Sequence, residues 1–202
     1  MIGVINTERC NLASVLLAIE KLNFETRVVH EPAEILSCSK LIMPGVGSFG
    51  ATASYLQSTG LSDAIIKAVD KNEIPILGIC LGMQILFSQS EEAAGETGLC
   101  LLDGHVHHLP SDIIERIPHI GWELAIPARV SALFPEQDSY LPYYFSHSYY
   151  CKPTDHNIIT TSINDTDLCS SVQKDHIFGV QFHPEKSHKM GRAVIQKFLE
   201  FS

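Results

Sequence analysis

The chain has 202 residues, of which 45% are hydrophobic and 18% are charged, and its net charge is −9. This length suits a single domain, residues 1–202, with a core that needs no disulfides, and the acidic balance argues against nucleic acid or an anionic membrane surface as the main partner. Since no stretch forms a secretory leader or reaches the roughly 18 apolar residues that span a bilayer, we expect a cytoplasmic protein with mostly reduced cysteines.

Strands and helices alternate in the first half of the chain. Asn11 and Ser62 are candidate N-caps of two of the helices. The alternation predicts an α/β fold with a mostly parallel sheet and helices on both faces. The expected strands are residues 2–5, 27–30, 41–43 and 74–80, and the expected helices are residues 12–22, 32–36, 51–57, 62–70 and 84–87.

Three glycines occur in the loop of residues 44–50, directly after the third strand. Ligands bind at this edge of open α/β sheets. Glycines there allow backbone N–H groups to approach a substrate closely and to stabilise a developing oxyanion. Taken alone, however, the loop is also what an ordinary glycine-rich turn looks like.

The fourth strand ends in Gly78-Ile79-Cys80-Leu81-Gly82 and is followed by a helical pattern. A sharp strand-to-helix corner strains the residue at the turn, and flanking glycines let the chain close it. Cys80 would then lie at a helix N-terminus, where the dipole favours a thiolate. The alternative, a buried structural cysteine, is about as plausible on this motif alone.

The second half of the chain is richer in short strands and turns, which predicts a more antiparallel half of the sheet. A final helix has apolar residues at helical spacing and should pack on the sheet. The expected strands are residues 99–102, 105–108, 122–126, 143–147, 158–162, 170–173 and 178–182, and the expected helix is residues 188–201.

The last of these strands leads into His183-Pro184-Glu185. Because proline ends the strand, we expect both side chains to be held in extended backbone at the sheet edge. An imidazole there can take a thiol proton, and a carboxylate on its other nitrogen fixes the tautomer. Without Cys80, a polar strand terminus would be the better explanation of this motif, but the two motifs together favour a Cys-His-Glu triad.

The remaining histidines give weaker signals. Strand alternation puts His105 and His107 on one face and His108 on the other, and no cysteine has ligand spacing around them. We therefore expect no metal site and no cofactor. The aromatic surroundings of His147 are explained by core packing.

In sequence order, four motifs resemble those of the class I (triad) glutamine amidotransferases. With Pro118-His119-Ile120-Gly121-Trp122 between the second and third motif, and with no room for a synthase domain, the chain is similar more narrowly to the glutaminase subunits of imidazole glycerol phosphate synthase. The four motifs are residues 44–47, 78–84, 144–149 and 182–187.

This resemblance implies that Cys80 attacks the side-chain amide of L-glutamine and that His183, oriented by Glu185, transfers the protons. It also implies an oxyanion site and a glutamine-binding site. The oxyanion residues would be Leu81, Gly45, Val46 and Gly47, and the glutamine-binding residues would be Gln84, Glu92, Ser148 and Tyr149.

The resemblance further implies a heterodimer with a cyclase subunit, a (β/α)8 barrel that receives the ammonia and makes imidazole glycerol phosphate and aminoimidazole carboxamide ribonucleotide in histidine biosynthesis. Asn11, Trp122 and Lys186 match family positions at that interface. In such enzymes the loop of residues 44–47 switches orientation when the partner docks.

Two positions depart from the family pattern. The first loop reads Asn6-Thr7-Glu8-Arg9-Cys10-Asn11 where an Asp and a Gly are expected before the Asn, and Glu123 stands where an Asn is common. These departures leave open a paralogous subunit that supplies ammonia for amidination of a surface sugar. A free-standing cysteine hydrolase and a non-enzymatic scaffold are the competing classes; the glutamine-binding matches argue against the first, and the intact triad argues against the second.

Overall fold

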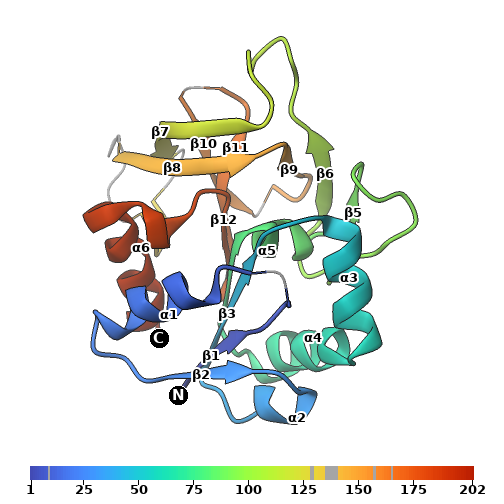
Figure 1. The fold of residues 1–202 in the computed structure, drawn as a ribbon, viewed down its shortest axis with the longest axis vertical. Helices are drawn as coiled ribbons and strands as arrows, with labels where there is room; N and C mark the ends of the chain where they lie inside the picture. Colours follow the sequence, from blue (N-terminus) through green and yellow to red (C-terminus); the bar gives the residue numbers. More distant parts are fainter. Residues whose placement is uncertain (9, 128–129, 135–140, 157, 165) are drawn as a thin grey trace.

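The structure is a computed structural model, and it describes all residues except 9, 128–129, 135–140, 157 and 165. Figure 1 shows the arrangement of its elements. The strands are β1 (Ile2–Ile5), β2 (Thr26–Val29), β3 (Lys40–Gly45), β4 (Ile76–Cys80), β5 (Gln89–Ser90), β6 (Gly104–His108), β7 (His119–Pro127), β8 (Leu141–His147), β9 (Tyr149–Pro153), β10 (Ile159–Ile163), β11 (Cys169–Lys174) and β12 (Ile177–Val180). The helices are α1 (Leu12–Glu20), α2 (Pro32–Ile35), α3 (Phe49–Ser58), α4 (Leu61–Asn72), α5 (Leu81–Ile85) and α6 (His188–Glu200), with a 3₁₀ turn η1 (Pro184–Lys186).

A nine-stranded sheet with the order β2-β1-β3-β4-β12-β11-β10-β7-β8 forms the centre of the molecule. Neighbouring strands from β2 to β12 are parallel, and those from β12 to β8 are antiparallel. This confirms the predicted mixed sheet with its antiparallel second half. A second, three-stranded sheet, β5-β6-β9, lies beside it.

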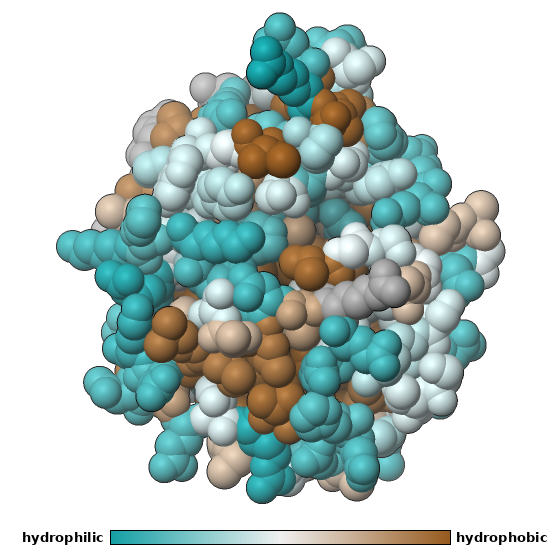
Figure 2. All heavy atoms as spheres, viewed as in Figure 1, coloured by the Kyte–Doolittle hydropathy of each residue, from teal (hydrophilic) through white to brown (hydrophobic). Residues whose placement is uncertain are grey.

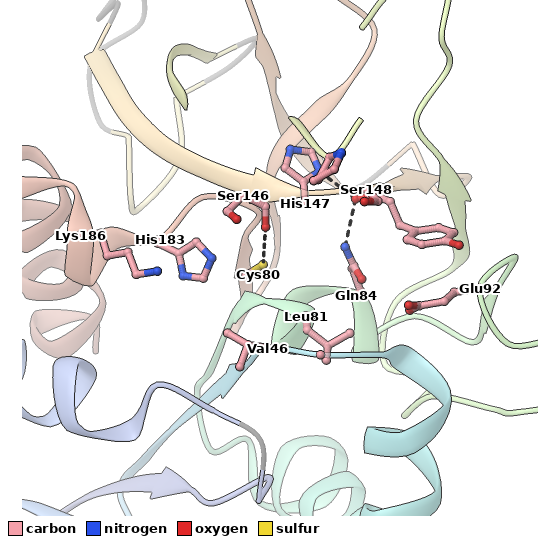
Figure 3. A pocket seen from close by; sticks show the side chains of 13 residues that line it. Val46, Cys80, Leu81, Gln84, Glu92, Ser146, His147, Ser148, His183 and Lys186 are labelled. Atoms are coloured by element: carbon pink, nitrogen blue, oxygen red, sulfur yellow. Dashed lines mark hydrogen bonds between the residues drawn. The ribbon is translucent and has the colours of Figure 1, made fainter. Parts of the chain in front are cut away.

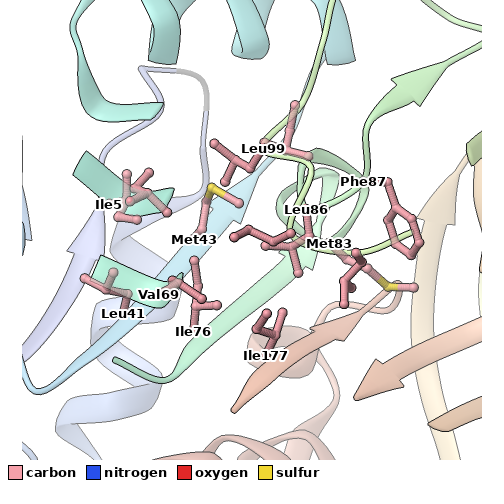
Figure 4. Packing of buried hydrophobic residues seen from close by; sticks show 14 of the residues in the cluster. Ile5, Leu41, Met43, Val69, Ile76, Met83, Leu86, Phe87, Leu99 and Ile177 are labelled. Atoms are coloured by element: carbon pink, nitrogen blue, oxygen red, sulfur yellow. The ribbon is translucent and has the colours of Figure 1, made fainter. Parts of the chain in front are cut away.

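Each face of the large sheet carries its own apolar core. One core joins the sheet to α2, α3, α4 and α5, and Figure 4 shows how Met43, Ile76, Met83 and Leu86 pack within it. The other core joins the sheet to α1 and α6. Figure 2 shows hydrophobic residues gathered in the middle of one face, below β7 and β8. The two cores hold the central strands from both sides, as the alternating pattern predicts.

Residues 99–102 do not form the predicted strand. Their leucines are buried as a strand's would be, but the N–H groups of Leu99, Leu101 and Leu102 donate to the carbonyls of Ile85 and Leu86 at the end of α5. The segment therefore satisfies carbonyls that the short helix leaves open. The pattern also gave no sign of β9, which pairs antiparallel with β6.

Of the two proposed N-caps, Asn11 does hold the N-cap position of α1, whereas Ser62 is not the N-cap of α4. Helix α4 begins at Leu61 after Gly60, whose φ of 74° is left-handed, so Ser62 lies inside the helix. Asn11 does precede α1, but its side-chain oxygen accepts a hydrogen bond from the Ser14 hydroxyl and not from a backbone N–H group. Among the described residues, no helix has both the length and the apolar character needed to cross a bilayer.

Candidate functional site

A pocket of about 300 Å³ opens where the central parallel strands end. Gly45 of β3 pairs with Cys80 of β4, and Val180 at the end of β12 pairs with Ile79. Parallel strands bring their carboxyl ends to one edge, so the loops after all three strands meet there. The pocket is lined by Val46, Gly47, Cys80, Leu81, Gln84, Glu92, Pro118, Ser146, His147, Ser148, Tyr149, His183 and Lys186.

Cys80 stands at the corner between β4 and α5, as the sequence predicts. Its φ of 55° and ψ of −110° are strained for a residue with a side chain. The corner is closed by close backbone contact, because a Cβ on Gly82 would lie 1.8 Å from the Met43 carbonyl oxygen. Helix α5 begins at Leu81, three residues earlier than expected, so the thiol precedes the first helical residue directly.

Three groups surround the Cys80 sulfur in the pocket. The Gln181 side-chain N–H donates to it at 3.6 Å, and the thiol itself donates to the Ser146 carbonyl at 3.9 Å. The third group is His183, which interacts with Cys80 through its side chain. Figure 3 shows Cys80 between His183 on one side and Gln84 on the other.

Sequence reasoning missed Gln181, which is fully buried and directly follows β12. The signal for it was a polar residue two positions before His183, on the same side of an otherwise apolar run. An amide N–H aimed at a sulfur stabilises the negative charge of a thiolate.

His183 and Glu185 are almost fully buried, and the ring Nδ1 of His183 lies 2.9 Å from Glu185 Oε1. Burial alone would lower the pKa of His183, but the interactions with Cys80 and Glu185 outweigh it and raise this pKa to about 9. A carboxylate that accepts from Nδ1–H leaves Nε2 as the nitrogen for proton transfer.

The backbone after His183 differs from the predicted extended geometry. Pro184 opens the 3₁₀ turn η1, as proline favours the first position of a helical turn. The Ser187 hydroxyl donates to the His183 carbonyl at 2.7 Å and accepts the Tyr144 N–H, which ties this turn to β8. This turn brings Glu185 back to the ring of His183.

Of the four candidate oxyanion residues, three line the pocket: Val46, Gly47 and Leu81. Gly45 instead completes β3, together with Pro44, and its backbone lies so close to α5 that a Cβ would sit 2.9 Å from the Gly82 nitrogen. The loop thus begins at Val46, one residue before Gly47, whose φ of 103° requires glycine.

The four candidate glutamine-binding residues all line the same pocket. The Gln84 amide donates to the Tyr149 carbonyl at 3.0 Å and to Gln181 Oε1 at 3.1 Å, so only its oxygen is left to accept from a ligand. Glu92 Oε2 accepts the Phe49 N–H at 2.7 Å, which fixes the carboxylate beside the pocket. Ser148 stands next to Tyr149 on the same wall.

His147 also lines the pocket, although its surroundings were interpreted as core packing alone. It is buried beside Phe145, with ring centroids 5.7 Å apart, and its Nδ1 lies 2.8 Å from the Tyr149 carbonyl oxygen. Burial lowers the pKa of His147 to about 4. His105, His107 and His108 lie on β6 outside the pocket, and the described part of the chain holds no cluster of three metal-ligand side chains.

Shared neighbours link the three candidate interface residues. Trp122 and Lys186 both contact the Tyr144 ring, and a second pocket is lined by Lys186 together with Ser14, whose hydroxyl donates to Asn11. Lys186 lines the pocket and lies over the Tyr144 ring at 5.6 Å. Trp122 is 45% exposed on β7 and stacks on His188, and Asn11 precedes α1. Ile120 and Leu124, which share the Trp122 side of β7, are exposed too.

Comparison with known proteins gives a consistent result over the whole chain. The family model described as "Glutamine amidotransferase class-I" matches residues 4–201. Among solved structures, PurLQS from Thermotoga maritima covers 98% of the chain and 96% of its own with a TM-score of 0.79; at 19% identity this likeness shows the fold.

Curated relatives named "Imidazole glycerol phosphate synthase subunit HisH" match at higher identity. The relative from Moorella thermoacetica is 40% identical over 98% of this chain and 94% of its own, and the one from Methanocaldococcus jannaschii is 38% identical over 99% of both. The chain therefore belongs to the class I glutamine amidotransferases and, within them, to the family of the imidazole glycerol phosphate synthase subunit HisH.

Proposed function

We propose that the chain is a glutaminase subunit that hydrolyses L-glutamine to glutamate and ammonia with Cys80 as nucleophile. The observation that carries this proposal is the thiol of Cys80, a residue with strained backbone, beside the ring of His183. The Nδ1 of that ring lies 2.9 Å from Glu185 Oε1. The names and coverage of the relatives support the same activity.

The proposed reaction has two halves. His183 Nε2 takes the thiol proton while the sulfur attacks the side-chain amide carbon of glutamine, and the resulting oxyanion accepts from the N–H groups of Leu81 and of the loop at residues 45–47. His183 then gives its proton to the departing nitrogen, which leaves as ammonia. In the second half, His183 deprotonates a water molecule that attacks the glutamyl thioester, and glutamate leaves with the thiol restored.

We assign recognition of the substrate's amino-acid end to Gln84, Glu92, Ser148 and Tyr149. The carboxylate of Glu92 and the free oxygen of Gln84 suit the α-ammonium group, because both are acceptors. The Ser148 hydroxyl and nearby backbone N–H groups suit the α-carboxylate. A pocket of about 300 Å³ accommodates one amino acid of this size.

The relatives' names imply a second subunit, and we propose that it is a cyclase with a (β/α)8 barrel that takes up the ammonia for histidine biosynthesis. Lys186, Trp122 and Asn11 would face it, with the exposed side of β7 supplying apolar contact. Cytoplasmic localisation belongs to this proposal, because all six cysteines, each among the described residues, are free. If one oxyanion donor turns inward only on docking, the partner should accelerate the reaction by roughly 10²–10³-fold.

The test is glutamate release from glutamine by the chain alone, and again with a histidine-pathway cyclase subunit and its nucleotide ligand. Cys80→Ser serves as the blank. Strong activation that disappears in the variant supports the proposal. Equal rates with and without the cyclase contradict the partner assignment, and activation by a sugar-amidinating synthase instead would assign the chain to that pathway.

A further inference from the structure

A line of hydrogen-bonded side chains runs from the pocket wall to the outside of β7. His119 of β7 pairs directly across from His147 of β8, and their facing nitrogens, Nδ1 of His119 and Nε2 of His147, are 3.3 Å apart. On the other side of the ring, His119 Nε2 lies 3.3 Å from Glu123 Oε1. Glu123 follows His119 by four residues and lies on the same face of β7. None of these groups has a role in the proposed chemistry.

The direction of each hydrogen bond follows from the groups at the two ends. The Tyr149 carbonyl can only accept, so His147 carries its proton on Nδ1, and since the ring is neutral its Nε2 must accept. His119 Nδ1 must therefore donate. At the far end, Asn164 donates to Glu123 Oε2 through its NH₂ group, because its oxygen is already used to accept the Leu124 N–H at 3.0 Å.

The far side of the His119 ring is held as well. Its Nε2 lies 3.3 Å from Glu123 Oε1, so the ring, which is only 9% exposed, stands between Glu123 and His147. His147 and Glu123 are the titratable groups that face His119, and His183 lies beyond His147.

We infer that His119 is a positioning residue: held by Glu123, it donates from Nδ1 to His147 Nε2 and so keeps His147 where it fixes the Tyr149 carbonyl at the pocket wall. That carbonyl also accepts from Gln84, whose other N–H goes to Gln181 and so, through the Gln181 amide, toward the Cys80 sulfur. The inference rests on the proposed glutaminase function for its effect on substrate, while the contacts between the side chains stand on the geometry.

Nuclear magnetic resonance of ¹⁵N-labelled histidines tests these hydrogen bonds without reference to activity. At pH 7, His147 should be neutral, with its proton on Nδ1 and with its Nε2 accepting from the His119 Nδ1–H. His119→Phe should remove the change in the His147 Nε2 resonance that this hydrogen bond causes. A proton on Nε2 of His147 in the unmodified chain overturns the inference.

Glutamine kinetics of the chain with its cyclase partner test the positioning role. His119→Phe keeps the ring stacked on Phe145 but removes the Nδ1–H donor, and should raise KM for glutamine about tenfold with kcat nearly unchanged, the cost of one buried hydrogen bond. His119→Asn places an amide donor where Nδ1 was and should restore most of this loss. Glu25→Gln, which removes a charge at the opposite edge of the sheet, is the control and should change nothing.

An unchanged KM in His119→Phe, or a loss confined to kcat, overturns the positioning role. If His119→Phe does not fold, the KM of His119→Asn and the histidine resonances of the unmodified chain still decide whether His119 positions His147. If the unmodified chain hydrolyses no glutamine even with a partner, the proposed function fails, and the histidine resonances still report whether the hydrogen bond from His119 to His147 exists.

Discussion

The buried carboxylate of Glu185 offers a sharp test of how His183 is held. Glu185 Oε1 lies 2.9 Å from His183 Nδ1, and Oε2 has no partner among the described residues. In Glu185→Gln the amide has two orientations. With its oxygen toward Nδ1–H, the NH₂ group takes the position of Oε2 and is buried without an acceptor. With its NH₂ toward Nδ1, His183 is forced into the wrong tautomer for proton transfer.

The size of the effect follows from the pKa of His183, which is raised from an ordinary value of 6.5 to about 9 although burial opposes the rise. This difference corresponds to roughly 3 kcal/mol of stabilisation of the imidazolium, shared between Cys80 and Glu185. Loss of the Glu185 share alone costs on the order of tenfold in rate, and loss of the correct tautomer raises the cost toward 10⁴. We expect kcat/KM to fall between about 10- and 10⁴-fold.

The assay is glutamate release as a function of pH, with urea unfolding to verify the fold and Glu25→Gln as the control for charge. The variant should also show a lower pKa for His183, because the carboxylate no longer stabilises the ring. Retention of more than a tenth of the activity would refute the reasoning, since His183 would then need neither the charge nor the tautomer that Glu185 provides.

Three further outcomes are expected. Gln181→Leu removes the N–H aimed at the Cys80 sulfur and should slow alkylation of Cys80 by about 10- to 100-fold; an unchanged rate in single-turnover labelling would contradict this. Gly82→Ala should destabilise the fold by about 3 kcal/mol or more in urea unfolding, because its Cβ would overlap the Met43 carbonyl, and a shift of less than 1 kcal/mol would be inconsistent with the corner described. Burial lowers the pKa of His147 from its ordinary value of 6.5 to about 4, so between pH 4 and 6.5 the unfolded chain binds more protons than the folded one. The free energy of unfolding should therefore fall by up to about 3 kcal/mol as the pH drops from 6.5 to 4. His147→Gln should abolish this pH dependence.

The parts of the site that sequence alone could predict are those that local rules determine. The apolar run before Cys80 and its flanking glycines specify a strand, a corner and a helix within a few residues. His183 was identified because proline must interrupt the strand there. The alternation of strands and helices was enough for the parallel half of the sheet.

What sequence could not predict depends on which strands become neighbours. Gln181 reaches Cys80 only because β12 pairs with β4, and His119 meets His147 only because of the register between β7 and β8. Residues 99–102 have a strand-like composition, but their N–H groups are taken by the end of α5, a tertiary contact that no local pattern reports.

The pairing of β12 with β4 also has a consequence for the order of events during folding. The residues that contact the Cys80 sulfur reach it only after β5 to β11 have formed and β12 has paired with β4 at the centre of the sheet. Contacts between such distant segments form late, because the loop between them must close first. Until then Cys80 is an ordinary thiol on an incomplete sheet, so a nascent or partly folded chain carries no activated nucleophile, and chemical competence arrives together with the finished fold.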